Sequence, residues 1–328
     1  MHVIVTGGLG FIGSNFIRHL LSEENDIFIT NIDAQTYAGG LDNLEDIANH
    51  KNYQYFKGKI QDSEFIDHIL STYKPNALIN FAAETHVDRS IKEAEPFIET
   101  NIIGTHVLLK SGVKNKLKNF IQISTDEVYG SIEYPHTFNE ESSIKPNSPY
   151  SASKASADHL VRAYNKTYGL NTTIIRCSNN FGPYQFPEKV IPYFVSLATN
   201  DTKVPVYGDG LNVRDWIYVI DFVRAIKLIL EKGKAGEIYN VGGKCELTNL
   251  QLVKTLLKKL GKKESLIEFV KDRPGHDRRY AMGCTKIKKE LGWNKKYNFE
   301  EALDETIKWY RDHMEWVKKR TGQSLVKQ

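Results

Sequence analysis

The stretch VIVTGGLGFIGSNF, residues 3–16, constrains the fold of this chain more than any other feature of the sequence. Gly7, Gly10 and Gly13 stand between a β-branched run at 2–6 and an apolar helical pattern at 11–22. Glycines at this place allow a tight turn and a close approach to a pyrophosphate, whose charge then faces the N-terminus of the helix. We therefore predict a dinucleotide-binding strand–turn–helix unit; a glycine-rich turn without a ligand is the alternative.

The end of the second predicted strand narrows the choice of dinucleotide. Asp33 follows Gly13 by twenty residues and ends the strand pattern at 27–32. A carboxylate at this position accepts hydrogen bonds from the adenosine ribose and repels a 2′-phosphate. The sequence therefore predicts NAD rather than NADP.

The first half of the chain alternates strand and helix patterns. We expect strands at 2–6, 27–32, 53–57, 77–81, 119–124 and 172–177, and helices between them at 11–22, 63–72, 97–115 and 150–168. Such alternation is typical of a parallel sheet covered on both faces. We predict an α/β fold with a Rossmann-type doubly wound parallel sheet.

The rhythm changes after residue 178, where Gly, Pro and Asn cluster in NNFGPYQFPEKVIP. We expect helices at 189–200, 221–231, 248–260 and 300–318, and short strands at 204–207 and 237–241. We divide the chain into an NAD-binding domain, 1–178, and a smaller α/β substrate region, 179–328, with segments near 208–245 returning to the first sheet.

Composition excludes several classes of protein. The net charge of +4 over 328 residues argues against an extended nucleic-acid surface. The three cysteines are far apart and form no CxxC pair, which favours a reducing, cytoplasmic compartment. We expect no signal peptide, and no apolar run is long enough to span a membrane.

The sequence YSASKASADHL carries Tyr150 and Lys154, which share a helix face because they are four residues apart. A nearby ammonium lowers the pKa of a tyrosine from its usual value of about 10. We expect such a tyrosine to take a proton from an alcohol while a hydride leaves the same carbon for nicotinamide. Thr125, at the end of a predicted strand, would hydrogen-bond the reacting oxygen or the tyrosine.

The sequence STDEVYG places two acids, Asp126 and Glu127, directly after Thr125. Oxidation of an alcohol needs neither of them. Once the alcohol is a ketone, however, the proton on the next carbon becomes acidic, and a carboxylate can remove it. A protonated carboxylic acid can then give a proton to a leaving hydroxyl, and adjacent carboxylates can hold these opposite states when their surroundings differ. The pair indicates an internal redox dehydration.

These motifs give the chain a family resemblance. It resembles the dTDP-glucose 4,6-dehydratases of the extended short-chain dehydrogenase/reductase family over nearly its whole length, through VTGGLGFIGSNF, TYAGG, FAAETHVDRS, FIETNIIGT, STDEVYG, YSASKASADHL, NNFGPYQFPEKVIP, VRDWIYV and DRPGHDRRYAMG. The resemblance implies conversion of dTDP-glucose to dTDP-4-keto-6-deoxyglucose and water through bound NAD, in deoxysugar synthesis of the dTDP-L-rhamnose type.

The resemblance also implies roles. Tyr150, helped by Lys154 and Thr125, would be the base at the 4-hydroxyl; Glu127 would take the carbon-5 proton; Asp126 would protonate the departing 6-hydroxyl. The implied cofactor contacts are Gly7, Gly10, Phe11, Ile12, Gly13, Asp33, Thr36, Lys59, Ile60, Ala82, Ala83, Thr100, Tyr150, Lys154 and Asn180. The implied substrate contacts are Thr85, Thr125, Asn179, Glu188, Lys189, Val190, Pro205, Tyr207, Arg214, Asn249, Arg273 and His276.

Some positions depart from the family pattern. Lys59 stands where relatives usually carry an aspartate, and the two residues between Asp33 and Thr36 are changed. Arg214 and Arg273 are expected in loops, where guanidinium groups would bind a diphosphate. No ligand spacing joins His86 or His276 to carboxylates or cysteines, so we predict no metal.

The family resemblance further implies a homodimer that pairs two helices from each chain. Apolar positions such as Ile103, Leu108 and Val161 allow a four-helix bundle, but they suit core packing equally well.

Three alternatives remain open. A sugar-nucleotide 4-epimerase shares the first step but needs neither Asp126 nor Glu127. Other 4,6-dehydratases act on GDP-mannose or CDP-glucose. A redox-sensing protein could hold NAD without turnover, although such proteins tend to lose the Tyr/Lys pair.

Overall fold

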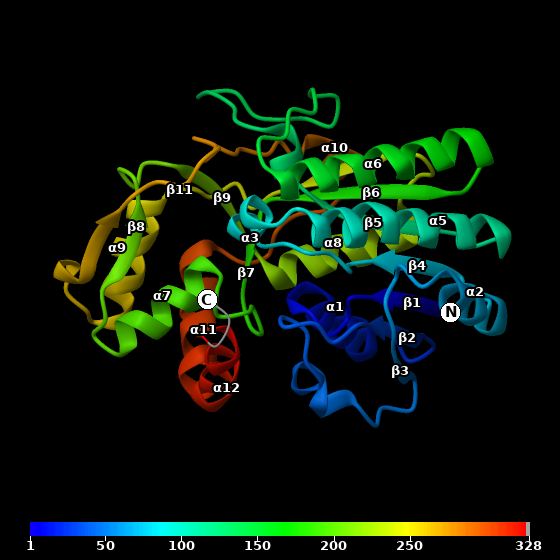
Figure 1. Cartoon of the computed structure of the whole chain (residues 1–328), viewed down its shortest axis with the longest axis horizontal. Coiled ribbons are helices and arrows are strands. Elements are labelled where there is room, and N and C mark those ends of the chain that lie inside the picture. The colour runs from blue at the N-terminus through cyan, green and yellow to red at the C-terminus, as the bar shows by residue number, and fades with distance from the viewer. Residues whose placement is uncertain (326–328) are drawn as a thin grey trace.

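A seven-stranded parallel sheet forms the centre of the molecule. The computed structural model describes residues 1–325, and its main sheet has the order β10-β6-β5-β4-β1-β2-β3 (Figure 1). Every neighbouring pair in this sheet is parallel. The strands are β1 (His2–Thr6), β2 (Phe28–Asp33), β3 (Tyr53–Lys57), β4 (Ala77–Asn80), β5 (Phe120–Thr125), β6 (Thr172–Cys177) and β10 (Ile238–Val241). This order confirms the doubly wound fold predicted from the alternating patterns.

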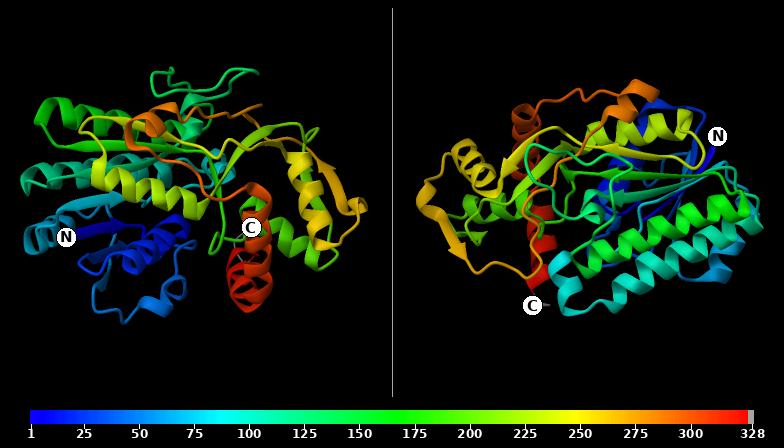
Figure 2. Two further views of the ribbon diagram at one scale, coloured as in Figure 1. Left: turned by 180° about the vertical axis from the view of Figure 1, so that it is seen from behind. Right: turned by 90° about the horizontal axis from the view of Figure 1, so that it is seen from above.

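Helices cover both faces of the sheet (Figure 2). On one face α1 (Phe11–Glu23) packs against α8 (Val219–Lys232). On the other face α5 (Thr105–Lys114) lies between α2 (Ser63–Tyr73) and α6 (Pro149–Tyr168). Alternate strand residues enter the two cores, Val3 and Val5 on the side of α8 and Ile4 on the side of α5. A strand that is buried on both faces must be apolar at every position, which explains why these runs do not alternate with polar residues.

The helix predicted at 97–115 is interrupted. It consists of α4 (Glu95–Phe97), a π-helical segment η3 (Ile98–Gly104) and α5. The close approach of another segment accompanies this irregularity, because a Cβ added at Gly104 would lie 2.5 Å from Ile60 Cδ1. Single π-helical turns are frequent at functional sites, and Thr100, a predicted cofactor residue, lies in this one.

The second half builds smaller sheets beside the first. β7 (Asn179–Phe181), β9 (Val213–Tyr218) and β11 (Glu246–Thr248) form one, and β8 (Val204–Tyr207) pairs with β12 (Ile267–Val270) in another. β10 and α8, by contrast, belong to the layers of the main sheet. The patterns did not predict β9, and Arg214, which was expected in a loop, lies within it. Charged residues hid this strand, because Arg214 and Asp215 are buried there. The domain boundary at residue 178 remains a prediction.

The remaining elements surround these sheets. The helix predicted at 300–318 is two helices, α11 (Phe299–Asp312) and α12 (Met314–Leu325), shown in red in Figure 1. They separate at His313, whose ring Nδ1 lies 2.8 Å from the Trp309 carbonyl oxygen near the end of α11. The others are η1 (Leu41–Asn43), η2 (Glu45–Ile47), α3 (Val87–Lys92), η4 (Asp126–Tyr129), α7 (Val190–Thr199), α9 (Asn249–Leu260), η5 (Glu264–Leu266) and α10 (Thr285–Leu291). None of the helices within residues 1–325 has the length and apolar character needed to cross a bilayer.

Candidate active site

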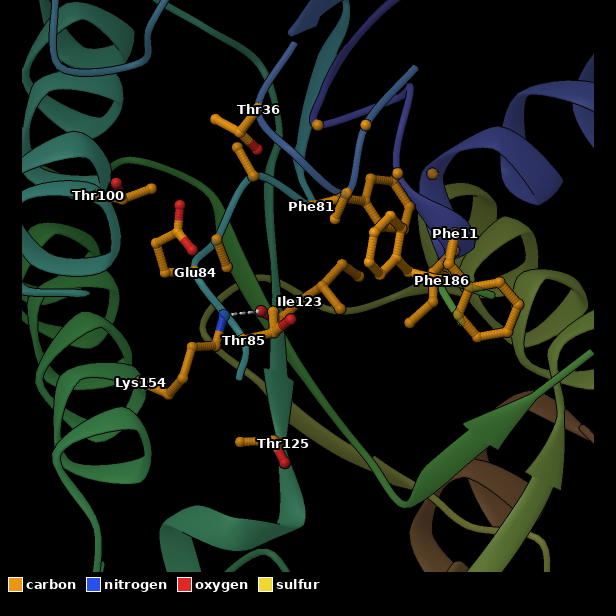
Figure 3. Close-up of a pocket in the computed structure, with 18 of the residues that line it drawn as sticks. Phe11, Thr36, Phe81, Glu84, Thr85, Thr100, Ile123, Thr125, Lys154 and Phe186 are labelled. Carbon is orange, nitrogen blue, oxygen red and sulfur yellow. Dashed lines mark hydrogen bonds between the residues drawn. The ribbon is translucent and has the colours of Figure 1, made fainter. Parts of the chain in front are cut away.

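A cavity of about 470 Å³ opens at the carboxyl ends of the main strands (Figure 3). Its lining includes the residues at or just after these ends: Gly7, Asp33, Gly58, Phe81, Thr125 and Cys177. Parallel α/β sheets bind their ligands at this edge, where the strand order reverses between β1 and β4. The fold therefore brings residues from the whole first half of the chain to one place.

The glycine turn gives the cavity an anion-binding floor. Gly7 has a φ of +72°, and a Cβ there would lie 2.6 Å from the backbone nitrogen of Ala82. A Cβ at Gly13 would lie 2.5 Å from the Gly7 carbonyl oxygen. Gly10 is the N-cap residue of α1 and has no side chain that could accept a hydrogen bond from the first turn. The N–H groups of this turn therefore remain available to an anion on the cavity side. This geometry fits a pyrophosphate.

Asp33 fixes one end of the cavity. Its carboxylate accepts hydrogen bonds from Leu9 N at 3.0 Å and Gln35 N at 2.8 Å. Burial raises the pKa of Asp33 above its usual value of 3.8, although the two backbone bonds favour the charged form. Each oxygen has a further lone pair, so the carboxylate can also accept from a ribose hydroxyl. The turn and Asp33 together fit NAD.

Buried polar atoms without partners point to a ligand in the same cavity. Ser124 Oγ, Asn179 Oδ1 and Asn180 Oδ1 are buried without a hydrogen bond, and all three residues line the cavity. Buried polar groups in folded proteins are nearly always satisfied by protein, water or ligand. These atoms are therefore available to a bound molecule.

Tyr150 and Lys154 both line the cavity from α6, as their spacing predicts. Lys154 Nζ donates to the Ile123 carbonyl oxygen at 2.7 Å, the dashed line in Figure 3. Burial raises the pKa of Tyr150 well above 10, Glu127 and Asp126 act in the same direction, and a hydrogen bond with Thr125 acts against them. The expected lowering by Lys154 is thus not what these side chains produce, because the effect of burial is larger.

Asp126 and Glu127, at the start of η4, occupy different electrostatic surroundings. Burial, then the neighbouring Glu127 and Asp215 carboxylates, raise the pKa of Asp126 well above 3.8. Burial also raises the pKa of Glu127 above 4.5, but Arg273, Arg214 and Lys189 all favour its charged form. Asp126 is 2% exposed, whereas Glu127 is partly exposed and lines the cavity. The surroundings therefore favour protonation of Asp126 more strongly than protonation of Glu127.

The predicted substrate residues fall into two groups. Thr85, Asn179, Glu188 and Lys189 line the cavity together with every predicted cofactor and catalytic residue. The lining does not include Val190, Pro205, Tyr207, Arg214, Asn249, Arg273 and His276. The roles of all these residues remain predictions.

Several of the outlying residues nevertheless gather on one side of the site. Arg273 Nη1 lies 3.2 Å from Asp88 Oδ1, and Tyr207 donates to the other oxygen of that carboxylate at 3.5 Å. His276 is in edge contact with Tyr207, with ring centroids 6.3 Å apart. Arg273 and Arg214 both act on the pKa of Glu127, which places this positive charge next to the cavity.

The sequence predictions missed Glu84, which also lines the cavity (Figure 3). Asn101 Nδ2 donates to the Glu84 carbonyl oxygen at 3.0 Å, and Glu84 N donates to Asn101 Oδ1 at 2.9 Å. Burial raises the pKa of Glu84 above 4.5. The available signal was its position, directly after Ala82 and Ala83 at the end of a predicted strand.

Within the described part of the chain, no three or more His, Cys, Asp and Glu side chains are grouped so as to hold a metal ion.

Comparisons with known proteins agree with this geometry. A family model described as GDP-mannose 4,6 dehydratase matches residues 4–306. The dTDP-glucose 4,6-dehydratase of Escherichia coli is 45% identical over 345 residues, covering 96% of this chain and 95% of the relative. The low-salt glycan biosynthesis protein Agl12 of Haloferax volcanii is 49% identical over 310 residues, covering 94% of this chain and 98% of the relative.

Solved structures give the same picture. DesIV, a dTDP-glucose 4,6-dehydratase from Streptomyces venezuelae solved with NAD and TYD, is 44% identical with a TM-score of 0.95 and covers 98% of this chain and 100% of its own. A UDP-glucose 4-epimerase from Thermotoga maritima is 33% identical with a TM-score of 0.89 and covers 96% of this chain and 100% of its own. The fold is thus shared by dehydratases and epimerases.

Proposed function

The chain belongs to the GDP-mannose 4,6 dehydratase family, and from this premise we propose that it is an NAD-dependent dTDP-glucose 4,6-dehydratase. It converts dTDP-glucose to dTDP-4-keto-6-deoxyglucose and water, for deoxysugar synthesis of the L-rhamnose type. The observation that carries this function is the acid pair: Asp126 and Glu127 line one cavity with Tyr150 and are held in surroundings that favour opposite protonation states.

The first step belongs to Tyr150 and Thr125. Deprotonated Tyr150 takes the proton of the 4-hydroxyl, while Thr125 hydrogen-bonds the tyrosine. NAD, which the glycine turn and Asp33 would hold, would supply the chemistry that the side chains lack: a hydride acceptor for carbon 4, a hydride donor for carbon 6, and a positive ring that favours the phenolate. Lys154, fixed to the backbone of β5 by its hydrogen bond to the Ile123 carbonyl oxygen, would favour the phenolate in its charged form, although burial lowers the pKa of its ammonium group.

The second step belongs to Glu127 and Asp126. Ionised Glu127 removes the carbon-5 proton, which the 4-ketone has made acidic. Protonated Asp126 gives its proton to the 6-hydroxyl, and water leaves. When the hydrogen returns with its electron pair to carbon 6, protonated Glu127 gives a proton back to carbon 5. Arg273, Arg214 and Lys189 stabilise the charged base, and Asp215 opposes ionisation of the acid. A 4-epimerase performs only the first step, and its reaction gives this acid pair nothing to do.

The experiment that tests the function uses dTDP-glucose carrying deuterium at carbon 4. We expect a product lighter than the substrate by one water, with the deuterium on the new methyl group and no net NADH. A Tyr150→Phe variant serves as the control without turnover. Recovery of a galactose epimer, or deuterium that never reaches the methyl group, contradicts the dehydratase. UDP-, CDP- and GDP-sugars run in parallel test the nucleotide preference.

We further propose that the protein is a cytoplasmic homodimer. Cys177, Cys245 and Cys284 are free thiols, as expected in a reducing compartment. Leu108 and Val161 are fully buried in the core and cannot form an interface. Ile98 and Ile103 are 47% and 48% exposed on η3, the segment that leads into α5. These side chains support pairing through the outer face of α5 and α6.

A further inference from the structure

The C-terminal helix α12 is fastened to the loop that follows β2. Three of its side chains reach this loop. Trp316 Nε1 donates to Asn43 Oδ1 at 3.0 Å, Lys319 Nζ lies 3.3 Å from Asp42 Oδ2, and Arg320 pairs with Asp42 Oδ1. We call these five residues the clasp: Asp42, Asn43, Trp316, Lys319 and Arg320.

A single residue of the clasp, Asn43, connects it to the dinucleotide site. Asn43 is fully buried, and its Nδ2 donates to the carbonyl oxygen of Leu9, in the glycine turn, at 2.7 Å. The amide of the same Leu9 donates to Asp33. Ala38 and Gly39, in the loop that the clasp holds, line the cavity. The amide side chain of Asn43 therefore joins α12 to the turn and to the carboxylate that fit NAD.

The centre of the clasp is the ion pair between the buried Arg320 and Asp42. Arg320 is 3% exposed, and its guanidinium occupies the space where a Cβ of Gly40 would otherwise stand. A buried cation of this kind needs its partner, because loss of one member leaves an unpaired charge. From the other side, Arg18 of α1 donates to the Asn43 carbonyl oxygen and to Asp46, and its guanidinium lies 4.0 Å from the ring centre of Tyr184. Tyr184 in turn contacts Trp309 and Trp316. The loop is held between α1 and α12.

We propose that α12 positions the cofactor loop so that the bound dinucleotide is retained from one turnover to the next. This inference rests on the proposed function, in which the cofactor ends each cycle in the form in which it began and need not leave. Retention of NAD then depends on how firmly the loop after β2 holds the Asp33 end of the cavity in place. Trp316 and Asp42 are positioning residues in this sense, acting through Asn43 and Leu9 without touching the reacting atoms.

The test measures the release of NAD. The purified protein is loaded with radiolabelled NAD, chased with excess unlabelled NAD, and sampled by filtration. Trp316→Phe removes one hydrogen bond and keeps an aromatic ring, and we expect about a five- to tenfold faster release. Asp42→Asn removes the partner of Arg320 and should release NAD faster still. The matched control is Trp293→Phe, the same substitution with the same loss of one indole hydrogen bond, here to the Asp221 carbonyl oxygen at 3.3 Å. Trp293 lies on the segment after α10, and its substitution should leave release unchanged.

A second readout separates positioning from general damage. We expect both clasp variants to raise the KM for NAD while kcat at saturating NAD stays within about twofold of the parent, because the catalytic groups are untouched. Release rates equal to those of the parent in both variants overturn the inference, as does an equal acceleration by Trp293→Phe. If the parent protein binds no NAD at all, the proposed function fails together with the clasp; if it binds NAD tightly and the variants do not matter, only the clasp fails.

Discussion

Two neighbouring residues, Asp126 and Glu127, differ in the charges that surround them. Asp126 faces two other carboxylates, whereas Glu127 faces Arg273, Arg214 and Lys189. The difference comes from charges that distant segments bring to the site, Arg214 and Asp215 of β9 and Arg273. At the scale of single residues, the proposed function depends on this difference.

The first prediction concerns the base. Glu127→Gln keeps the shape of the side chain and removes its ability to accept a proton. We expect product formation to fall by about 10²- to 10⁴-fold, while reduction of bound NAD by dTDP-glucose persists as an absorbance at 340 nm. The control is Glu133→Gln, an exposed position on the loop after η4. Unchanged turnover in Glu127→Gln would remove this residue from the mechanism.

The second prediction concerns pH. Glu127 must be ionised, and burial raises its pKa above 4.5. Turnover should therefore fall as the pH drops through a value higher than that of a free glutamate. Asp126 must be protonated, and burial raises its pKa well above 3.8. Turnover should accordingly also fall as the pH rises through that raised value.

A profile of kcat/KM against pH checks this prediction. We expect a bell shape for the parent protein, with the alkaline limb assigned to Asp126 and the acid limb to Glu127 and Tyr150, which both act in their deprotonated forms. An acid limb centred at or below 4.5 would contradict the raised pKa of Glu127. The residual activity of Glu127→Gln should lose the contribution of Glu127 to the acid limb and keep that of Tyr150.

At the scale of elements, the turn between β1 and α1 is the most demanding part of the structure. Gly7 combines a positive φ with the backbone of Ala82 at contact distance. Gly169, at the C-cap of α6, has a similar φ of +69° but no atom within 4 Å of an added Cβ. An alanine at position 169 therefore carries only the cost of the positive φ, whereas an alanine at position 7 carries the cost of the positive φ and that of the contact of its Cβ with Ala82.

The third prediction uses this pair. Gly169→Ala should cost about 1 kcal/mol of stability through φ alone and leave NAD affinity unchanged. Gly7→Ala should cost more, because the β1 and β4 edges must separate, and it should abolish NAD binding in a titration calorimeter. Equal effects of the two substitutions on NAD affinity would show that the approach to Ala82 does not matter.

At the scale of the whole molecule, the exposed apolar side chains are unevenly placed. Ile98 and Ile103 lie on η3, beside the α5 and α6 layer, whereas Leu211 lies on the loop between β8 and β9. The fourth prediction is that light scattering finds a dimer for the parent and a monomer for Ile103→Glu. Leu211→Glu, at a 45% exposed position far from that layer in sequence, should remain dimeric. A dimeric Ile103→Glu variant would place the interface elsewhere.

Local sequence determined the main sheet, the glycine turn and the residues of the acid and tyrosine motifs. Each of these depends on patterns within about twenty residues, such as buried β-branched runs, an uncapped helix start, or four-residue spacing on a helix. The carboxyl ends of parallel strands meet at one edge, so the position of the cavity followed as soon as the strands were assigned. Thr125, Tyr150 and Asp33 were found in this way.

Tertiary structure decided what depends on contacts between distant segments. β9 was missed because its buried Arg214 and Asp215 form hydrogen bonds with residues far along the chain, Asp277 and Cys245, which no local pattern records. The break at His313 sends α12 to Asp42 and Asn43, more than 270 positions earlier, and no periodicity records such a contact. The protonation states of Asp126 and Glu127 likewise depend on charges brought from β9 and from the segment around Arg273. Electrostatic effects act through space, and only the folded chain fixes those distances.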